Sequence, residues 1–237
     1  DGGMGGADCR PAAVKNFLGY SLKRLGVDYI DVYRPARLDP AVPIEDTIGA
    51  IADLVKAGYV RHIGLSEVGV ETIRRAAKVH PIVDLQIEYS LVTRKPEDKI
   101  FPVLAELGLS ATLYGVMSRG LLTGAKPTAG DARGHMPRFT RENQAHNERV
   151  VAGIAAFAAD HARTPAELMI AWTLAKQPAL VPVIGARKPA QLDALFAAVA
   201  RPLTAAEVAA LEALVPRDAI AGDRYPTAHM AQLDSER

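Results

Sequence analysis

The chain has little cysteine, few aromatic residues and almost no net charge. Its 237 residues include a single cysteine, Cys9, which excludes a disulfide framework and a cluster of thiolate metal ligands. Lys and Arg number 28 against 27 Asp and Glu, and this balance gives no reason to expect binding to nucleic acid or to a membrane surface. No apolar run is long enough for a membrane span. These absences favour a reducing, cytoplasmic location.

Three kinds of chemistry lack their usual sequence patterns. The six histidines have no spacing typical of metal ligands, so no metal site is expected. No predicted strand ends in the lysine that Schiff-base chemistry requires. No Gly-x-Gly-x-x-Gly follows a predicted strand, which gives a dinucleotide-binding Rossmann fold little support.

What the chain does contain is a regular alternation of strands and helices. Strict alternation predicts right-handed crossovers and a parallel sheet, either an open doubly wound sheet or part of an eight-stranded α/β barrel. A long polar stretch at 118–143 interrupts the alternation. The predicted strands are Tyr29–Tyr33, Val60–Ser66, Val83–Tyr89, Ala111–Met117 and Leu180–Ile184. The predicted helices are Pro11–Val27, Ile44–Ala57, Val70–Val79, Glu97–Leu107, Asn147–Ala162, Pro165–Lys176, Pro189–Ala200 and Ala205–Leu214.

The two ends differ from this pattern. Residues 1–10 are rich in glycine and are expected to be the remnant of an earlier connection, and residues 218–237 an irregular tail. The whole of 1–237 is expected to form one domain, truncated at its N-terminus. Truncation predicts an exposed apolar edge at Tyr29 and, through such edges, self-association.

Five segments between Tyr20 and Ala200 carry a recognisable pattern: LGVDYIDVY, LVKAGYVRHIGLSE, LQIEYSL, LYGVMSRGLLTG and VPVIGARKPAQLDAL. Through these segments the sequence resembles the aldo-keto reductase family from about Tyr20 to Ala200. The resemblance implies a (β/α)8 barrel of the TIM type, of which this chain holds the fourth to eighth strands preceded by one helix. It also implies that the catalytic Asp, Tyr and Lys of the family lie upstream of Asp1.

The fourth catalytic residue of the family, a histidine, is replaced here. The family pattern D-L-Y-x-x-H-R-x-D matches the sequence from Asp31 to Asp39, and Ala36 stands at the histidine position. An alanine side chain can neither donate to a carbonyl nor transfer a proton. Arg34 and Arg37 beside it either form an ion pair with Asp39 that shapes the rim, or face the substrate.

The resemblance also implies a cofactor site for NADP(H). In the family, the positions of Ser66 and Gln86 hold the nicotinamide carboxamide and that of Tyr114 stacks on the ring, while Glu67 replaces the usual asparagine. Without the family, the same residues are ordinary polar and core positions of a sheet. The stretch SRGLLTG offers Ser118, Arg119, Gly120 and Leu122 to the pyrophosphate.

The start of the predicted helix at Pro189 matches the family's site for the 2′-phosphate of NADPH. Gly185, Arg187 and Gln191 occupy the matching positions, and Lys188 adds a second cation at a helix N-terminus. Paired cations favour NADPH over NADH. Leu195 stands where the family often has an asparagine that contacts adenine. The simpler alternative is a basic, solvated helix start.

Taken with the family, these residues predict an oxidoreductase that reduces aldehydes or ketones with NADPH, acting on a small carbonyl substrate. Because the catalytic residues are missing, this chain alone is expected to be weakly active or inactive. The alternative is a barrel module that binds NADPH and reports redox state without turnover.

Overall fold

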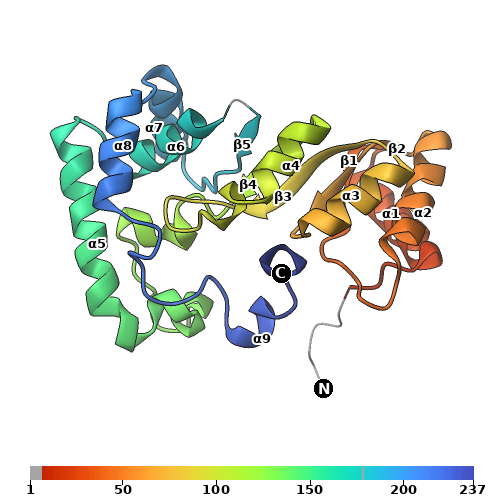
Figure 1. The fold of residues 1–237 in the computed structure, drawn as a ribbon, viewed down its shortest axis with the longest axis horizontal. Coiled ribbons are helices and arrows are strands. Elements are labelled where there is room, and N and C mark those ends of the chain that lie inside the picture. Colours follow the sequence, from red (N-terminus) through yellow and green to blue (C-terminus); the bar gives the residue numbers. More distant parts are fainter. Residues whose placement is uncertain (1–6, 178) are drawn as a thin grey trace. The chain divides into compact units, whose positions relative to one another are not determined.

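The computed structural model describes residues 7–177 and 179–237, and they form two compact units (Figure 1). Unit 1 contains the chain up to Ile87, Lys99–Ala111 and Leu233–Arg237, and unit 2 contains Glu88–Asp98 and Thr112–Gln232. Residues 1–6 of the predicted N-terminal loop lie outside the described residues, and residues 7–10 form neither helix nor strand. The prediction of a single domain stays a prediction.

Five strands form the predicted parallel sheet, and their hydrogen-bonding order is the order of the chain. The pairs that unit 1 contains, β1 with β2 and β2 with β3, are both parallel. This α/β arrangement confirms the predicted fold class, and among the described residues β1 and β5 are the edge strands. The strands are β1 (Ile30–Tyr33), β2 (Val60–Ser66), β3 (Ile82–Glu88), β4 (Ser110–Tyr114) and β5 (Leu180–Pro182).

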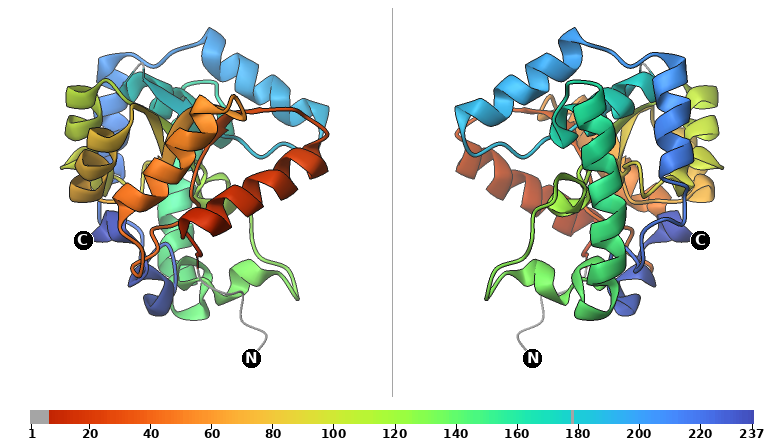
Figure 2. Two further views of the ribbon diagram at one scale, coloured as in Figure 1. Left: turned by 90° about the vertical axis from the view of Figure 1, so that its right-hand side faces the viewer. Right: turned by 90° about the vertical axis from the view of Figure 1, so that its left-hand side faces the viewer.

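Unit 1 packs its helices on a core of branched apolar side chains. Helix α1 begins with a proline and ends at Gly26, whose φ of 67° is left-handed, as the sequence predicts for a helix end. Helices α1 and α2 lie side by side (Figure 2). The helices are α1 (Pro11–Leu25), α2 (Ile44–Lys56), α3 (Val70–Val79) and α4 (Ile100–Leu107). Fully buried side chains here include Ile48, Ile51, Ile63, Leu65, Ile73 and Leu85.

The outer face of unit 1 keeps large apolar side chains in contact with solvent. On α1, Phe17 is 50% exposed and Tyr20 is 67% exposed. Tyr29, just before β1, is 39% exposed, as predicted for an edge, and Arg61 stacks on its ring at 4.0 Å and donates to its hydroxyl. Self-association through this edge stays a prediction.

Unit 2 is built around Trp172, which is fully buried and stacks on Tyr89 with ring centroids 5.2 Å apart. The sequence Thr-Pro-Ala-Glu at 164–167 predicts a capping box at the start of α6, and the helix has it: the Thr164 hydroxyl accepts from the Glu167 amide, and the Glu167 carboxylate accepts from the Thr164 amide. Helices α5 and α8 lie side by side (Figure 2). The helices are α5 (Arg141–Asp160), α6 (Pro165–Lys176), α7 (Pro189–Ala200), α8 (Ala205–Leu214) and α9 (Thr227–Met230).

Irregular segments of the sequence contain more local structure than expected. The polar stretch 118–143 includes three short 3-10 turns, and α5 starts at Arg141, within that stretch. The tail is irregular except for α9 and a turn at Asp234–Glu236. Within the described residues, no helix combines the length and the apolar character that a membrane crossing needs.

Candidate cofactor site

In unit 1, the register of β2 and β3 places two of the predicted nicotinamide contacts beside each other. Ser66 pairs with Gln86 and Gly64 pairs with Asp84, so these four residues share one face of the sheet. Ser66 is buried, and Gln86 is partly exposed. Ser66 is the last residue of β2 and Gln86 lies two residues before the end of β3, so a hydroxyl and a carboxamide stand together near the carboxyl ends of parallel strands, where binding sites of α/β proteins are usually found.

The strand end at β1 contains the predicted substrate-pocket residue Arg34. Its guanidinium donates two hydrogen bonds to Asp84, from Nε at 2.9 Å and from Nη2 at 2.6 Å. Asp39, expected to pair with it, instead accepts the amides of Cys9 and Ala41. The predicted rim ion pair is therefore replaced by a pair that reaches past β2, from the residue after β1 to Asp84 within β3.

A cavity of about 300 Å³ opens at this end of β1, and Arg34 and Ala36 are among its lining residues. Tyr33 and Cys9 also line it, and the Cys9 thiol donates to the Arg37 carbonyl. Burial raises the pKa of this thiol. The Arg37 guanidinium donates to the Ala36 carbonyl at 2.6 Å. Alanine at the expected histidine position thus contributes a methyl group and no proton donor to the wall of this hollow.

The residue after β2, Glu67, is fully buried and has a left-handed φ of 52°. Its carboxylate accepts from the Ser235 hydroxyl at 2.6 Å, and its carbonyl accepts from the Ser235 amide. Asp234 accepts from the Gly69 amide at 2.8 Å and from the Thr72 hydroxyl at 2.7 Å. The C-terminal residues of unit 1 therefore cap the start of α3. Ser235 also donates a hydrogen bond to the carboxylate of Glu67, the residue that replaces the family's asparagine.

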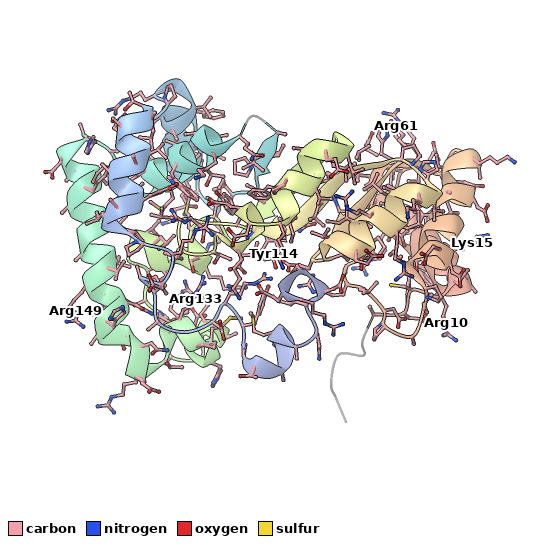
Figure 3. All side chains as sticks on the ribbon, viewed as in Figure 1. Arg10, Lys15, Arg61, Tyr114, Arg133 and Arg149 are labelled. Atoms are coloured by element: carbon pink, nitrogen blue, oxygen red, sulfur yellow. The ribbon has the colours of Figure 1, made fainter. Side chains whose placement is uncertain are left out.

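In unit 2, Tyr114 ends β4, and Figure 3 labels its side chain. Its hydroxyl lies 3.2 Å from the hydroxyl of Tyr225 and accepts from Nη1 of Arg224 at 3.3 Å. The phenol is part-buried. Sequence reasoning identified Tyr114 but gave no reason to connect it with the tail.

The loop after β4 bends through three consecutive left-handed residues. The φ angles of Ser118, Arg119 and Gly120 are 46°, 56° and 92°, and two of these residues carry a Cβ that disfavours such angles. Backbone strain of this kind collects at functional sites. The loop is closed internally, because the amides of Gly120 and Leu122 donate to the Met117 carbonyl. Leu122 is fully buried.

A buried carboxylate that sequence reasoning missed holds this loop in place. Glu88 is fully buried, and the guanidinium groups of Arg119, Arg138 and Arg224 lie 3.1, 3.6 and 3.8 Å from its oxygens. Arg138 also donates to the Ser118 hydroxyl at 2.9 Å. The signal in the sequence was the alternation of Asp84, Gln86 and Glu88 with apolar residues in β3, because an acidic residue on a buried strand demands a partner.

The start of α7 carries the residues predicted to bind a 2′-phosphate. The Gln191 side chain accepts the amides of Arg187 and Lys188, at 2.6 and 3.0 Å, and so fixes the turn before the helix. Arg187 is exposed. A Cβ built on Gly185 meets no atom within 4 Å, so its backbone is open to an approaching ligand. An exposed guanidinium beside an open glycine at a helix N-terminus has the donor chemistry that a phosphate requires.

Across residues 7–177 and 179–237 there is no group of three His, Cys, Asp or Glu residues that could hold a metal ion.

Comparison with known proteins identifies relatives along most of the chain. A probable aldo-keto reductase 1 of Glycine max is 40% identical over 220 residues, which cover 91% of this chain and 63% of that protein. The aldo-keto reductase str7 of Strobilurus tenacellus is 38% identical over 233 residues, or 95% of this chain and 69% of that protein. The chain thus spans about two thirds of the length of these relatives.

Solved structures agree with the sequence relatives. The glycerol dehydrogenase AKR11B4 from Gluconobacter oxydans aligns with a TM-score of 0.81 at 26% identity, over 89% of this chain and 65% of that one. The thermostable aldo-keto reductase Tm1743, solved with the inhibitor epalrestat, aligns with a TM-score of 0.72 at 26% identity, over 87% and 67%. These neighbours are TIM barrels, which agrees with the incomplete barrel predicted here. The model of the aldo/keto reductase family matches residues 3–216, and the chain belongs to that family.

Proposed function

We propose that this chain is the NADP-binding part of an aldo-keto reductase that reduces aldehydes or ketones to alcohols. The observation that carries the proposal is the α7 start, where Arg187 is exposed beside the open backbone of Gly185. A guanidinium there suits the dianionic 2′-phosphate that distinguishes NADPH from NADH. When bound, the cofactor supplies the hydride, and the chain supplies binding and orientation.

For the nicotinamide, the proposal assigns Ser66 and Gln86 to the carboxamide. Their side chains are neighbours on adjacent strands of unit 1 and offer both donors and acceptors. Tyr114 of unit 2 is assigned to stacking on the ring, which would present one ring face to the substrate. Glu67 takes no part in this assignment, because Ser235 already donates to its carboxylate.

For the pyrophosphate, the proposal assigns Ser118, Arg119, Gly120 and Leu122. Arg119 supplies the charge, since its guanidinium lies in a cluster of three arginines around Glu88. The left-handed turn requires a glycine at position 120, because an added Cβ would lie 3.0 Å from the Ala125 Cβ and 3.2 Å from Arg133 Nη1. Gln191 is assigned to holding the turn before α7 rather than to direct contact.

The small carbonyl substrate is assigned to the hollow at the end of β1, with Arg34 and Ala36 in its wall. Arg37, which donates to its neighbour's carbonyl, is a second candidate for this wall. A positioned general acid contributes about 10²- to 10⁴-fold in rate, and Ala36 cannot provide it. Residues 1–237 should therefore bind NADPH but reduce carbonyls very slowly.

Ala36 also supports a second candidate function, an NADPH-binding module that senses redox state without turnover. The two functions differ in one result. If the longer protein that contains this chain reduces aldehydes at ordinary enzyme rates, the reductase is correct, whereas tight binding without turnover in that protein supports the sensor.

The test of cofactor binding is a titration of residues 1–237 with NADPH and with NADH, followed by ligand fluorescence. We expect saturable binding that favours NADPH. Arg187→Ala should reduce NADPH affinity about 10- to 100-fold and leave NADH affinity unchanged, as expected for one hydrogen-bonded ion pair with phosphate. The control is Arg149→Ala, which removes an exposed arginine of α5 (Figure 3) and should change neither affinity. A folded, monodisperse sample that binds neither nucleotide would contradict the proposal.

A further inference from the structure

Residues Ala219–Tyr225, called here the C-terminal strap, are attached firmly to unit 2. The buried Asn147 of α5 donates to the Ala221 carbonyl at 3.0 Å and accepts from the Ala221 amide at 2.8 Å. The neighbouring His146 ring lies 2.7 Å from the Ala219 carbonyl oxygen. A segment with no regular secondary structure is thus fixed by side chains of one helix.

One position of the strap is restricted to glycine by both conformation and space. Gly222 has a φ of 90°, and a Cβ added there would lie 2.7 Å from the backbone carbon of Pro137. Its carbonyl accepts from Arg138 Nε at 3.4 Å. The close approach sets the path of the chain just before Arg224 and Tyr225.

The strap ends with Tyr225, whose ring lies near two guanidinium groups. The Arg119 guanidinium lies 4.5 Å from the centre of the Tyr225 ring, and that of Arg224 lies 5.6 Å from it. Both distances are within the range of cation–π attraction. The Tyr225 hydroxyl then reaches the hydroxyl of Tyr114 at 3.2 Å.

We propose that Tyr225 is a positioning residue for the cofactor, acting through Tyr114 and Arg119. Tyr114 is followed by Gly115, which has a left-handed φ of 69° and lies so close to the Glu88 side chain that an added Cβ would be 3.0 Å from its Cγ. A hydrogen bond at the tip of the phenol fixes the direction in which the side chain points, which stacking on the nicotinamide requires. The Tyr225 ring holds the Arg119 guanidinium in place through cation–π attraction. This inference rests on the proposed function, in which Tyr114 stacks on nicotinamide.

The test compares the binding of the whole cofactor with the binding of a ligand that lacks its nicotinamide end. Tyr225→Phe removes the hydroxyl and keeps the ring under Arg119, so it should weaken NADPH binding to residues 1–237 by about 3- to 10-fold, the range for one neutral hydrogen bond. Binding of 2′-phospho-ADP-ribose, which lacks nicotinamide, should not change. Tyr20→Phe, which alters an exposed tyrosine of α1, is the matched control and should leave both affinities unchanged.

A double-mutant cycle tests the contact itself. Tyr114→Phe should cost less affinity for NADPH in the Tyr225→Phe protein than in the wild type, because the shared hydrogen bond is already gone. Equal NADPH affinity in Tyr225→Phe and wild type would overturn the inference and leave the proposed function standing. Equal weakening of NADPH and 2′-phospho-ADP-ribose would overturn it in favour of a general structural role. A folded wild-type chain that binds neither ligand would overturn the inference together with the proposed function.

Discussion

Replacing Glu88 by glutamine tests whether the buried carboxylate holds unit 2 together. The substitution keeps the size of the side chain and removes the charge that faces Arg119, Arg138 and Arg224. Removing one partner of a buried ion pair costs about 3–5 kcal/mol, because the opposite charge is left buried. We expect the lower end, about 3 kcal/mol, because Arg138 keeps neutral hydrogen-bond partners and the Arg119 side chain is 20% exposed.

The single tryptophan of the chain provides the assay. Trp172 lies buried in the core of unit 2, so its fluorescence reports the unfolding of the unit that contains Glu88. For a chain of this size, 1 kcal/mol shifts Tm by about 2–4 °C, so Glu88→Gln should lower the Trp172 transition by about 6–12 °C.

The matched control removes an exposed carboxylate of the same unit. Glu148 pairs with Lys126 at 2.7 Å, with side chains 43% and 65% exposed, and such pairs contribute at most about 1 kcal/mol. Glu148→Gln should therefore shift the transition by less than about 4 °C. If the Trp172 transition of Glu88→Gln lies no lower than that of this control, the ion pairs of Glu88 with the three arginines do not stabilise unit 2, and the reasoning is wrong.

Two further predictions concern unit 1. Asp234→Ala removes the acceptor for the Gly69 amide and the Thr72 hydroxyl, so it should destabilise the start of α3 by about 1 kcal/mol and speed amide exchange in its first turn; unchanged exchange would contradict the cap. The hydrogen-bonded Arg75 lowers the pKa of Glu45 from 4.5 to about 2, so the pair's contribution to stability is complete above pH 4.5 and is lost as the pH falls towards 2. In Arg75→Gln, NMR titration should show the Glu45 pKa returning towards 4.5, and a value that stays near 2 would refute the assignment to Arg75.

Features set by neighbouring residues were the ones that the sequence predicted well. The capping box at Thr164 and the glycine at the end of α1 depend on contacts within a few residues, and both are found. Helix α5 starts earlier than expected, at Arg141, because its first turns are polar and lack the apolar spacing that marks a helix.

Contacts between distant parts of the chain could not be predicted. Arg34 was expected either to pair with Asp39, which is near in sequence, or to face the substrate, but the fold places Asp84 of β3 within its reach. No local pattern links Glu67 to Ser235, which lie 168 residues apart. Tyr114 was selected as a site residue by family resemblance, and only the folded chain connects its hydroxyl with Tyr225.

The most direct test of the central claim is amide hydrogen exchange of residues 1–237 with and without saturating NADPH. The account predicts slower exchange in peptides that cover 118–122 and 185–191, and no change along α5. Saturable binding that leaves both of these segments unprotected would contradict the claim that they hold the cofactor's phosphates.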